Sequence, residues 1–114
     1  MDSLKRYTRG SVFIISIKGR ILQEDSASLE DALEEALKKR VYRIVLDFME
    51  VKHICSTALG VMVSMKRRVR RNEGDIKIAL KNGEVKKLLE LTMLDKIFEL
   101  FDMKDSAIKA FDDI

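Results

Sequence analysis

The spacing of apolar residues changes repeatedly along this chain, which limits the folds open to it. Val12–Ile17 and Ile44–Leu46 are apolar runs rich in β-branched residues, as buried strands are. Between them, apolar residues recur at helical spacing, at Leu29, Ala32, Leu33, Ala36 and Leu37. Strand patterns that alternate with helix patterns indicate a mostly parallel or mixed sheet with helices packed against it.

Read along its length, the chain predicts the order β, β, α, β, α, β, α, β, α. The expected strands are Leu4–Arg9, Val12–Ile17, Tyr42–Phe48, Asp75–Leu80 and Ile97–Phe101. The expected helices run from Asp25 or Ser26 to Arg40, over Ser56–Arg71, from Asn82 or Gly83 onward, and over Asp105–Asp112. A turn at Gly10-Ser11 makes the first two strands a hairpin, Gly19 ends the second strand, and a loop follows Phe48 as far as Ile54. We therefore expect one α/β domain over residues 1–114, with a mixed central sheet and about four helices.

Composition and charge limit the cellular compartment and the kinds of partner that we expect. The single cysteine, Cys55, excludes an intrachain disulfide and fits a reducing compartment, and no apolar stretch is long enough to span a membrane. We expect a cytoplasmic protein with no membrane partner. The net charge is only +3, and the basic residues are densest over Lys66–Arg71. At the end of a helix such residues complement the dipole, so a solvated face is preferred there to a nucleic-acid site.

Nothing in the sequence indicates catalysis. One histidine, His53, and one cysteine cannot supply the three or four ligands of a zinc site, and they make a poor nucleophile–base pair. The isolated glycines match neither the dinucleotide fingerprint nor the P-loop. We expect no catalytic residue, no metal and no cofactor.

The segment from His53 to Gly60 carries the most information. A buried strand ends before it, and two small hydroxyl residues, Ser56 and Thr57, open the following helix. Free backbone N–H groups and the positive end of the dipole lie there, so an anion would be well held. On physical chemistry alone, the simpler interpretation is that Ser56 caps the helix.

This segment resembles the signature of STAS domains of the anti-sigma factor antagonist type, in which an apolar strand leads into Asp-Ser-Ser-Gly-Leu-Gly or Asp-Ser-Thr-Gly-Leu-Gly. The likeness extends to other segments: Gly19-Arg20-Ile21, Leu88–Leu94, Lys96-Ile97-Phe98, Ala107 and Phe111. It implies the STAS fold. It also implies a chain that binds an anti-sigma factor, which is a serine kinase as well, and so releases a sigma factor. By the resemblance, that kinase phosphorylates Ser56 and breaks the complex, and a serine phosphatase restores it.

The same resemblance places partner binding at Cys55, Ser56, Thr57 and Ala58. Four positions depart from the family pattern: Cys55 and Leu22 stand where Asp is common, and Ala58 and Met93 replace glycines. These changes leave an alternative open, in which the chain is a scaffold subunit of a larger signalling or transport assembly and is not phosphorylated. Cys55 is expected to be inert packing, with a redox-sensitive thiol as the second interpretation.

Overall fold

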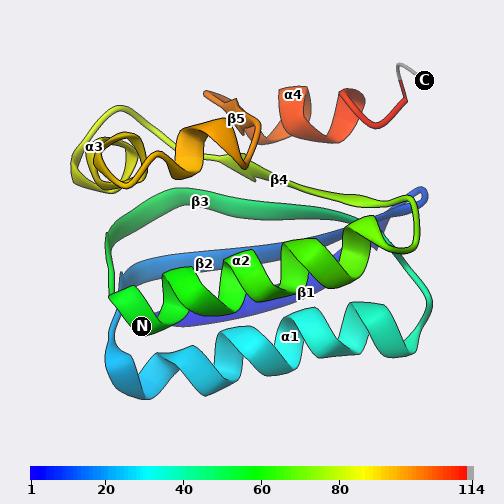
Figure 1. The fold of residues 1–114 in the computed structure, drawn as a ribbon, viewed down its shortest axis with the longest axis horizontal. Coiled ribbons are helices and arrows are strands. Elements are labelled where there is room, and N and C mark those ends of the chain that lie inside the picture. The colour runs from blue at the N-terminus through cyan, green and yellow to red at the C-terminus, as the bar shows by residue number, and fades with distance from the viewer. Residues whose placement is uncertain (113–114) are drawn as a thin grey trace.

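The computed structural model describes residues 1–112 and contains one five-stranded sheet with helices on both faces (Figure 1). The strands are β1 (Ser3–Arg9), β2 (Val12–Ile21), β3 (Arg43–Ile54), β4 (Asp75–Ala79) and β5 (Leu100–Phe101). The helices are α1 (Ser26–Lys38), α2 (Ser56–Arg70), α3 (Glu84–Leu91) and α4 (Lys104–Lys109). Two 3₁₀ turns, η1 (Gln23–Asp25) and η2 (Leu94–Lys96), precede α1 and β5. The predicted order of elements is confirmed.

The strands lie in the sheet in the order in which they occur in the chain, from β1 to β5. β1 pairs antiparallel with β2 through the hairpin, and each later pair is parallel. The sheet is therefore mixed, as the alternating patterns predict. The parallel strands bring their carboxyl ends to one edge, and both α1 and α2 begin there (Figure 1).

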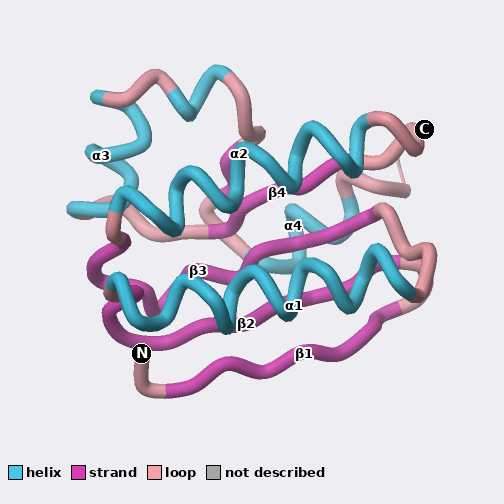
Figure 2. Tube along the Cα trace, turned by 60° about the horizontal axis from the view of Figure 1, so that its bottom comes forward, coloured by secondary structure: helices cyan, strands magenta, loops and turns pink. Residues whose placement is uncertain are grey.

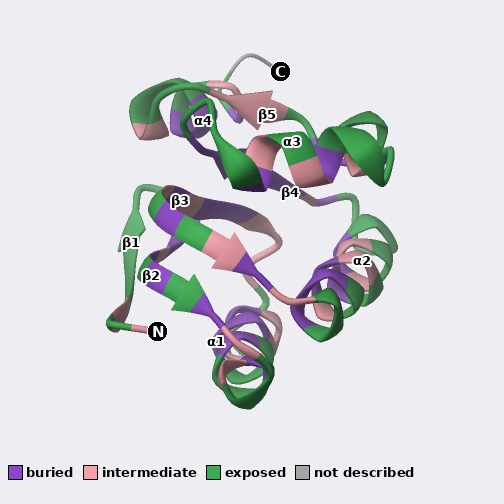
Figure 3. Cartoon of the chain, turned by 90° about the vertical axis from the view of Figure 1, so that its left-hand side faces the viewer, coloured by how far each residue is buried: buried purple, intermediate pink, exposed green. Residues whose placement is uncertain are grey.

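Helices α1 and α2 lie side by side on one face of the sheet, whereas α4 lies on the other (Figure 2). The larger core forms beneath α1 and α2, where Leu33 and Met62 meet Phe13 and Leu46. A smaller apolar cluster lies on the α4 face: Val12, Ile14, Val45, Ala79, Ala107, Ile108 and Phe111. Figure 3 shows that the helix sides turned toward the sheet are buried and the outer sides exposed.

Two strands are longer than predicted. Gly19 does not end β2: it lies inside the strand at φ +92°, where the pairing with β3 shifts register. The predicted loop after Phe48 is also wrong, because β3 continues to Ile54 with a second irregularity opposite Ser16 and Lys18. Each irregularity breaks the alternation of inward and outward side chains, which hides a strand from pattern analysis.

The burial of β4 and the bounds of the last strand and helix also differ from those predicted. The alternation in Asp75–Leu80 is typical of a half-buried strand, yet from Ile76 to Ala79 β4 is buried on both faces, since α4 covers the second one. Its Lys77 remains buried, and the Nζ atom is 2.6 Å from Glu99 and 4.9 Å from the centre of the Phe111 ring. The last strand is only Leu100–Phe101, and α4 begins at Lys104 with Met103 as its N-cap, not at Asp105 or Ser106.

Candidate functional site

Helix α2 begins where β3 ends, at the carboxyl edge of the parallel strands. Cys55 is its N-cap residue, with extended backbone angles, and Ser56 is the first helical residue. The interpretation of Ser56 as the cap is therefore wrong by one residue. The Cys55 N–H donates to the carbonyl oxygen of Ile21 at 2.9 Å, which fixes the start of α2 beside the end of β2.

The starts of α1 and α2 are joined by side-chain contacts. The Ser26 hydroxyl lies 3.4 Å from the Cys55 sulfur, and the Thr57 hydroxyl donates to the amide oxygen of Gln23 at 2.7 Å. Neither N-cap residue, Asp25 or Cys55, provides a side-chain cap hydrogen bond. The first-turn N–H groups of two neighbouring helices are thus left without a capping side chain, which favours negative charge at this end of the molecule.

Four hydroxyl residues lie in the first turns of α1 and α2, and their surroundings differ. Ser26 is buried, and the exposed Thr57 is engaged with Gln23. Ser56 is exposed, and its hydroxyl has no hydrogen-bond partner within residues 1–112. Cys55 is half-buried, and the side chain of Ala58 faces the core with no exposed surface. Ser28, the third residue of α1, is also exposed and has no hydrogen-bond partner within residues 1–112, so Ser56 is the open hydroxyl at the start of α2 and Ser28 the open hydroxyl at the start of α1.

The turn that carries Gln23 is held by Asp25. Its carboxylate accepts the Leu22 backbone N–H at 2.9 Å and lies 3.1 Å from the α-amino group of Met1. These two contacts, the backbone one first, hold the pKa of Asp25 below its usual value. The sequence indicated Asp25 only as a possible cap, and no local pattern pointed to Gln23, because its contact with Thr57 spans 34 residues.

The surface next to Ser56 is open and, farther along α2, apolar. Gly60 lies one turn after Ser56, is exposed, and has no atom within 4 Å of the place where a β-carbon would be. Toward the end of α2, Lys66 donates to the carbonyl oxygen of Ile97, which ties the end of the α3–η2 segment to the helix. That segment exposes Leu91 (82%), Met93 (57%) and Ile97 (44%). In the sequence, Leu91 follows Val85, Leu88 and Leu89 as an apolar position of the same helix, so its exposure was not expected.

Three of the basic residues in the segment Lys66–Arg71 form ion pairs or hydrogen bonds within the fold. Lys66 pairs with Asp75 at 2.8 Å, Arg68 binds the carboxylate of Glu34 on α1, and Arg70 donates to the carbonyl oxygen of Gly74 at 3.2 Å. These contacts tie α2 to α1 and β4, whereas Arg67 and Arg71 are exposed.

Residues 1–112 contain neither a metal cluster nor a helix able to span a membrane. No group of three or more His, Cys, Asp or Glu side chains there is placed to hold a metal ion. No helix in that range has the length and apolar character needed to cross a membrane.

Comparison with known proteins identifies the class that this fold and site define. The family model of the STAS domain matches residues 3–107, and the chain belongs to the STAS domain family. Its relatives carry the name anti-sigma factor antagonist. One is the anti-sigma F factor antagonist of Paenibacillus polymyxa, which is 24% identical over 98 residues, or 85% of this chain and 84% of that protein.

Solved structures show the same fold. An anti-sigma factor antagonist from Mycobacterium paratuberculosis superposes with a TM-score of 0.89 at 22% identity, covering 97% of this chain and 94% of that one. The antagonist SpoIIAA in its unphosphorylated form gives a TM-score of 0.73 at 14% identity, covering 98% of this chain and 100% of that one. SpoIIAA of Bacillus in its phosphorylated form gives 0.71 at 13% identity, with 96% and 99% covered. The predicted STAS fold is confirmed.

Proposed function

We propose that this chain is a cytoplasmic anti-sigma factor antagonist whose binding to its partner is switched off by phosphorylation of Ser56. The observation that carries the proposal is the exposed hydroxyl of Ser56, which has no hydrogen-bond partner and lies at the first position of α2. Neither α2 nor the neighbouring α1 has a side-chain cap at its start. The chain needs no catalytic residue for this role, since a kinase and a phosphatase do the chemistry. The partner in this proposal is an anti-sigma factor that is also a serine kinase, which is what the resemblance to anti-sigma factor antagonists implies.

A phosphate at Ser56 changes the surface more than the fold. It adds roughly −1.5 to −2 charges near neutral pH, and the N–H groups at the start of α2 favour that charge. The fold therefore tolerates the modification, whereas a partner seated on Ser56 and the open surface at Gly60 meets new bulk and charge. A relative of the same fold has been solved both with and without phosphate.

The partner surface extends from Ser56 along α2. Cys55 and Thr57 lie beside Ser56 at the surface, whereas Ala58 contributes by filling the core beneath it. The exposed Leu91, Met93 and Ile97 supply apolar area on the α3–η2 segment, whose end Lys66 of α2 contacts at Ile97. Apolar contacts flanked by a switchable polar group fit a reversible protein–protein interface.

A pull-down from native lysate tests the switch. Wild type and Ser56→Ala should capture the same anti-sigma factor, and Ser56→Asp should capture much less. Ser106→Asp is the matched control, since Ser106 is an exposed serine in the first turn of α4 on the other face of the sheet. Its capture should equal that of wild type. All four proteins should melt within a few degrees of one another, because exposed substitutions usually change stability by less than about 0.5 kcal/mol.

The alternative is a scaffold subunit of a larger signalling or transport assembly that is not phosphorylated. It is favoured by Cys55 and Ala58, which stand where the family motif has Asp and Gly. Mass spectrometry of the protein from its native cell separates the two functions. Phosphate on Ser56 supports the switch, whereas an unmodified Ser56 together with equal capture by all four proteins supports the scaffold.

A further inference from the structure

One edge of the sheet is open along the whole length of a strand. β1 is the first strand in the order β1 to β5, so among the strands of residues 1–112 only β2 pairs with it. Figure 2 shows β1 along one border of the molecule, with no other segment on its outer side. In an antiparallel pair, alternate residues direct their N–H and C=O groups away from the partner strand. Within residues 1–112, these outward groups of β1 have no hydrogen-bond partner.

The two edges of the sheet differ in what they offer to another polypeptide. β5, at the far edge, has two residues, whereas β1 has seven. The side chains of β1 from Lys5 to Arg9 are all exposed, so no part of the fold covers this strand there. An open edge strand of this length is a template for an additional strand, which main-chain hydrogen bonds would hold. β1 is therefore the place where another chain can extend the sheet.

The charged side chains of β1 are all of one sign. Lys5, Arg6 and Arg9 are cations, and the strand has no carboxylate. Arg6 pairs with Glu35 of α1 and Arg9 with Asp105 of α4, each at 3.0 Å, and both pairs are partly exposed. Exposed ion pairs of this kind contribute little to stability, so either arginine can be shared with a new carboxylate. Lys5 forms no ion pair within residues 1–112.

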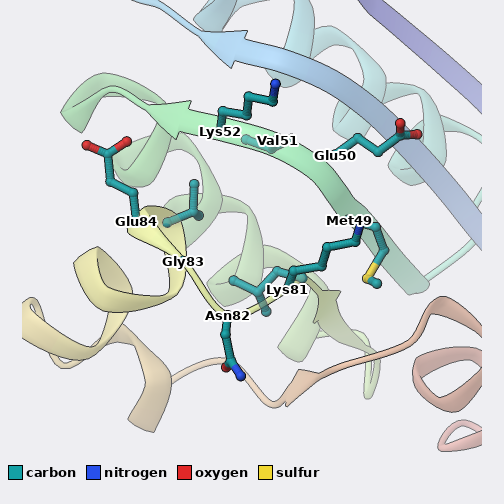
Figure 4. Close-up of a pocket in the computed structure, with 10 residues that line it drawn as sticks. Met49, Glu50, Val51, Lys52, Lys81, Asn82, Gly83 and Glu84 are labelled. Carbon is teal, nitrogen blue, oxygen red and sulfur yellow. The ribbon is translucent and has the colours of Figure 1, made fainter.

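Charge of one sign distinguishes β1 from the groove between β3 and the β4–α3 connection, which has a volume of about 370 Å³. That groove is lined by as many carboxylates as ammonium groups: Glu50, Glu84, Lys52 and Lys81 (Figure 4). The acidic residue that precedes β1, Asp2, lies over Gly19 of β2 and not at the open edge, since a β-carbon at Gly19 would be 2.7 Å from the Asp2 carboxylate. Charge therefore selects an acidic occupant for the edge of β1, and selects none for the groove.

Pairing of two copies of this chain through β1 would bring cations together. Antiparallel pairing centred on Arg6 places that residue opposite itself, and pairing centred on Lys5 does the same for Lys5. Pairing centred on Tyr7 places Lys5 opposite Arg9. Like charges directly opposite one another destabilise a pair of strands. The edge is therefore protected against a second copy, but not against a strand with acidic side chains.

We propose that β1 is a docking strand for an acidic, extended segment of a partner protein, which joins the sheet as an additional strand. Main-chain hydrogen bonds hold the segment, and its carboxylates are selected by Lys5, Arg6 and Arg9. β2 lies between β1 and β3, the strand that leads into α2, so the docked segment leaves Ser56 accessible. Docking at β1 therefore does not depend on phosphorylation of Ser56.

The test is an NMR titration of the ¹⁵N-labelled full chain with the synthetic peptide Glu-Thr-Val-Glu-Glu-Val. In antiparallel pairing with β1, this peptide sets a glutamate opposite each of Arg9, Arg6 and Lys5. The amide signals of β1 should shift saturably, and the affinity should fall as salt is raised. The double variant Lys5→Glu/Arg9→Glu should weaken binding by about tenfold or more. The matched control Arg67→Glu/Arg71→Glu makes the same change in net charge at exposed residues of α2 and its C-cap, and its affinity should stay within about twofold of wild type.

Two further peptides test the main-chain hydrogen bonds. They have the same sequence and carry N-methyl groups at either the odd or the even positions. Since alternate N–H groups of an added strand face β1, one of these peptides should lose binding and the other should keep it. Equal affinities of the two would mean that no strand is added, and would overturn the proposal.

Other results would also reject an acidic strand at β1. They are the absence of saturable shifts, shifts centred on α2 or on the groove beside β3, and equal loss of affinity in the two double variants. Binding of Lys-Thr-Val-Lys-Lys-Val as tightly as the glutamate peptide would contradict selection by charge. Shifts of the β1 signals with protein concentration, in the absence of peptide, would identify a second copy of this chain as the occupant instead.

Discussion

Gly74 lies so close to Tyr42 that a β-carbon added to it would be 2.0 Å from the Tyr42 carbonyl oxygen. This approach places the turn after α2 against the start of β3, and the next residue, Asp75, donates its N–H to the same oxygen at 2.9 Å. The residue at position 74 must therefore be a glycine because of its neighbour, although its φ lies outside the left-handed region.

We expect opposite results from the same substitution at two glycines. Gly74→Ala should destabilise the fold strongly, since the Tyr42 backbone cannot yield to the new methyl group. Gly60→Ala should stabilise it by about 0.5–1 kcal/mol, because Gly60 is inside α2 with open space around it and alanine favours the helix. Urea unfolding of both variants measures this, and a stabilised Gly74→Ala would contradict the close contact.

Truncation of a central leucine should be severe. Leu46 is fully buried in β3, and Leu46→Ala should lower the free energy of unfolding by about 2–5 kcal/mol, from a total of about 5–15 kcal/mol. Leu91→Ala removes the same atoms from a side chain that is 82% exposed and should change stability by less than about 0.5 kcal/mol. Similar losses in the two variants would mean that the burial of β3 or the exposure of α3 is wrongly placed.

Backbone strain at Met93 predicts a stabilising substitution. Met93 has φ +61°, in the left-handed region, where a side chain costs about 1 kcal/mol and glycine does not. Met93→Gly should therefore raise the melting temperature. Met103 is the matched control, a methionine of equal exposure with an extended backbone, and Met103→Gly should lower the melting temperature or leave it unchanged. The prediction fails if both substitutions lower it equally.

The contact between Glu34 and Arg68 predicts a pH dependence. Arg68 donates to both carboxylate oxygens of Glu34, and this hydrogen bonding lowers the pKa of Glu34 below its ordinary value of 4.5. The contact therefore stabilises the fold fully above about pH 4.5 and loses its contribution as pH falls through the lowered pKa. Both groups are partly exposed, so the contribution should be under about 1 kcal/mol.

Unfolding of Glu34→Gln at neutral pH and at about pH 2 measures that contribution. The variant should be less stable than wild type at neutral pH, and the difference should shrink in acid. Glu90→Gln, an exposed residue of α3 without an ion pair in residues 1–112, should show no such difference. A gap between Glu34→Gln and wild type that stays constant with pH would contradict the assigned contact.

The order of elements could be predicted because the apolar pattern of most of them is regular. The lengths of β2 and β3 could not, since the register shifts near Gly19 and Met49 break the alternation that identifies a strand. Lys77 misled the interpretation of β4, because a lysine in an alternating pattern predicts an exposed face. The Lys77 ammonium is instead accommodated beside Glu99 and Phe111, which come from distant segments.

The start of α2 was predicted at Ser56, where the structure has it, because small hydroxyl residues follow a buried strand there. The surroundings of Ser56 were not predictable, since they depend on Gln23, Ser26 and Ile21, which only the folded sheet brings near. Exposure of Leu91 was missed for a similar reason. Helical spacing shows which residues share a face, but the rotation of α3 is set by how Val85 and Leu89 pack into the core.

The sequential order of the strands also bears on synthesis of the protein. Every strand after β1 pairs with the strand made immediately before it. As the chain emerges from the ribosome, the partner of each new strand has therefore already been made. No strand made late in synthesis has to be inserted between two strands made earlier. β1 forms one edge of the sheet throughout, and the advancing edge is finally occupied by β5, whose two residues offer little to a second molecule. Assembly in this direction keeps the time during which a newly made chain can aggregate short.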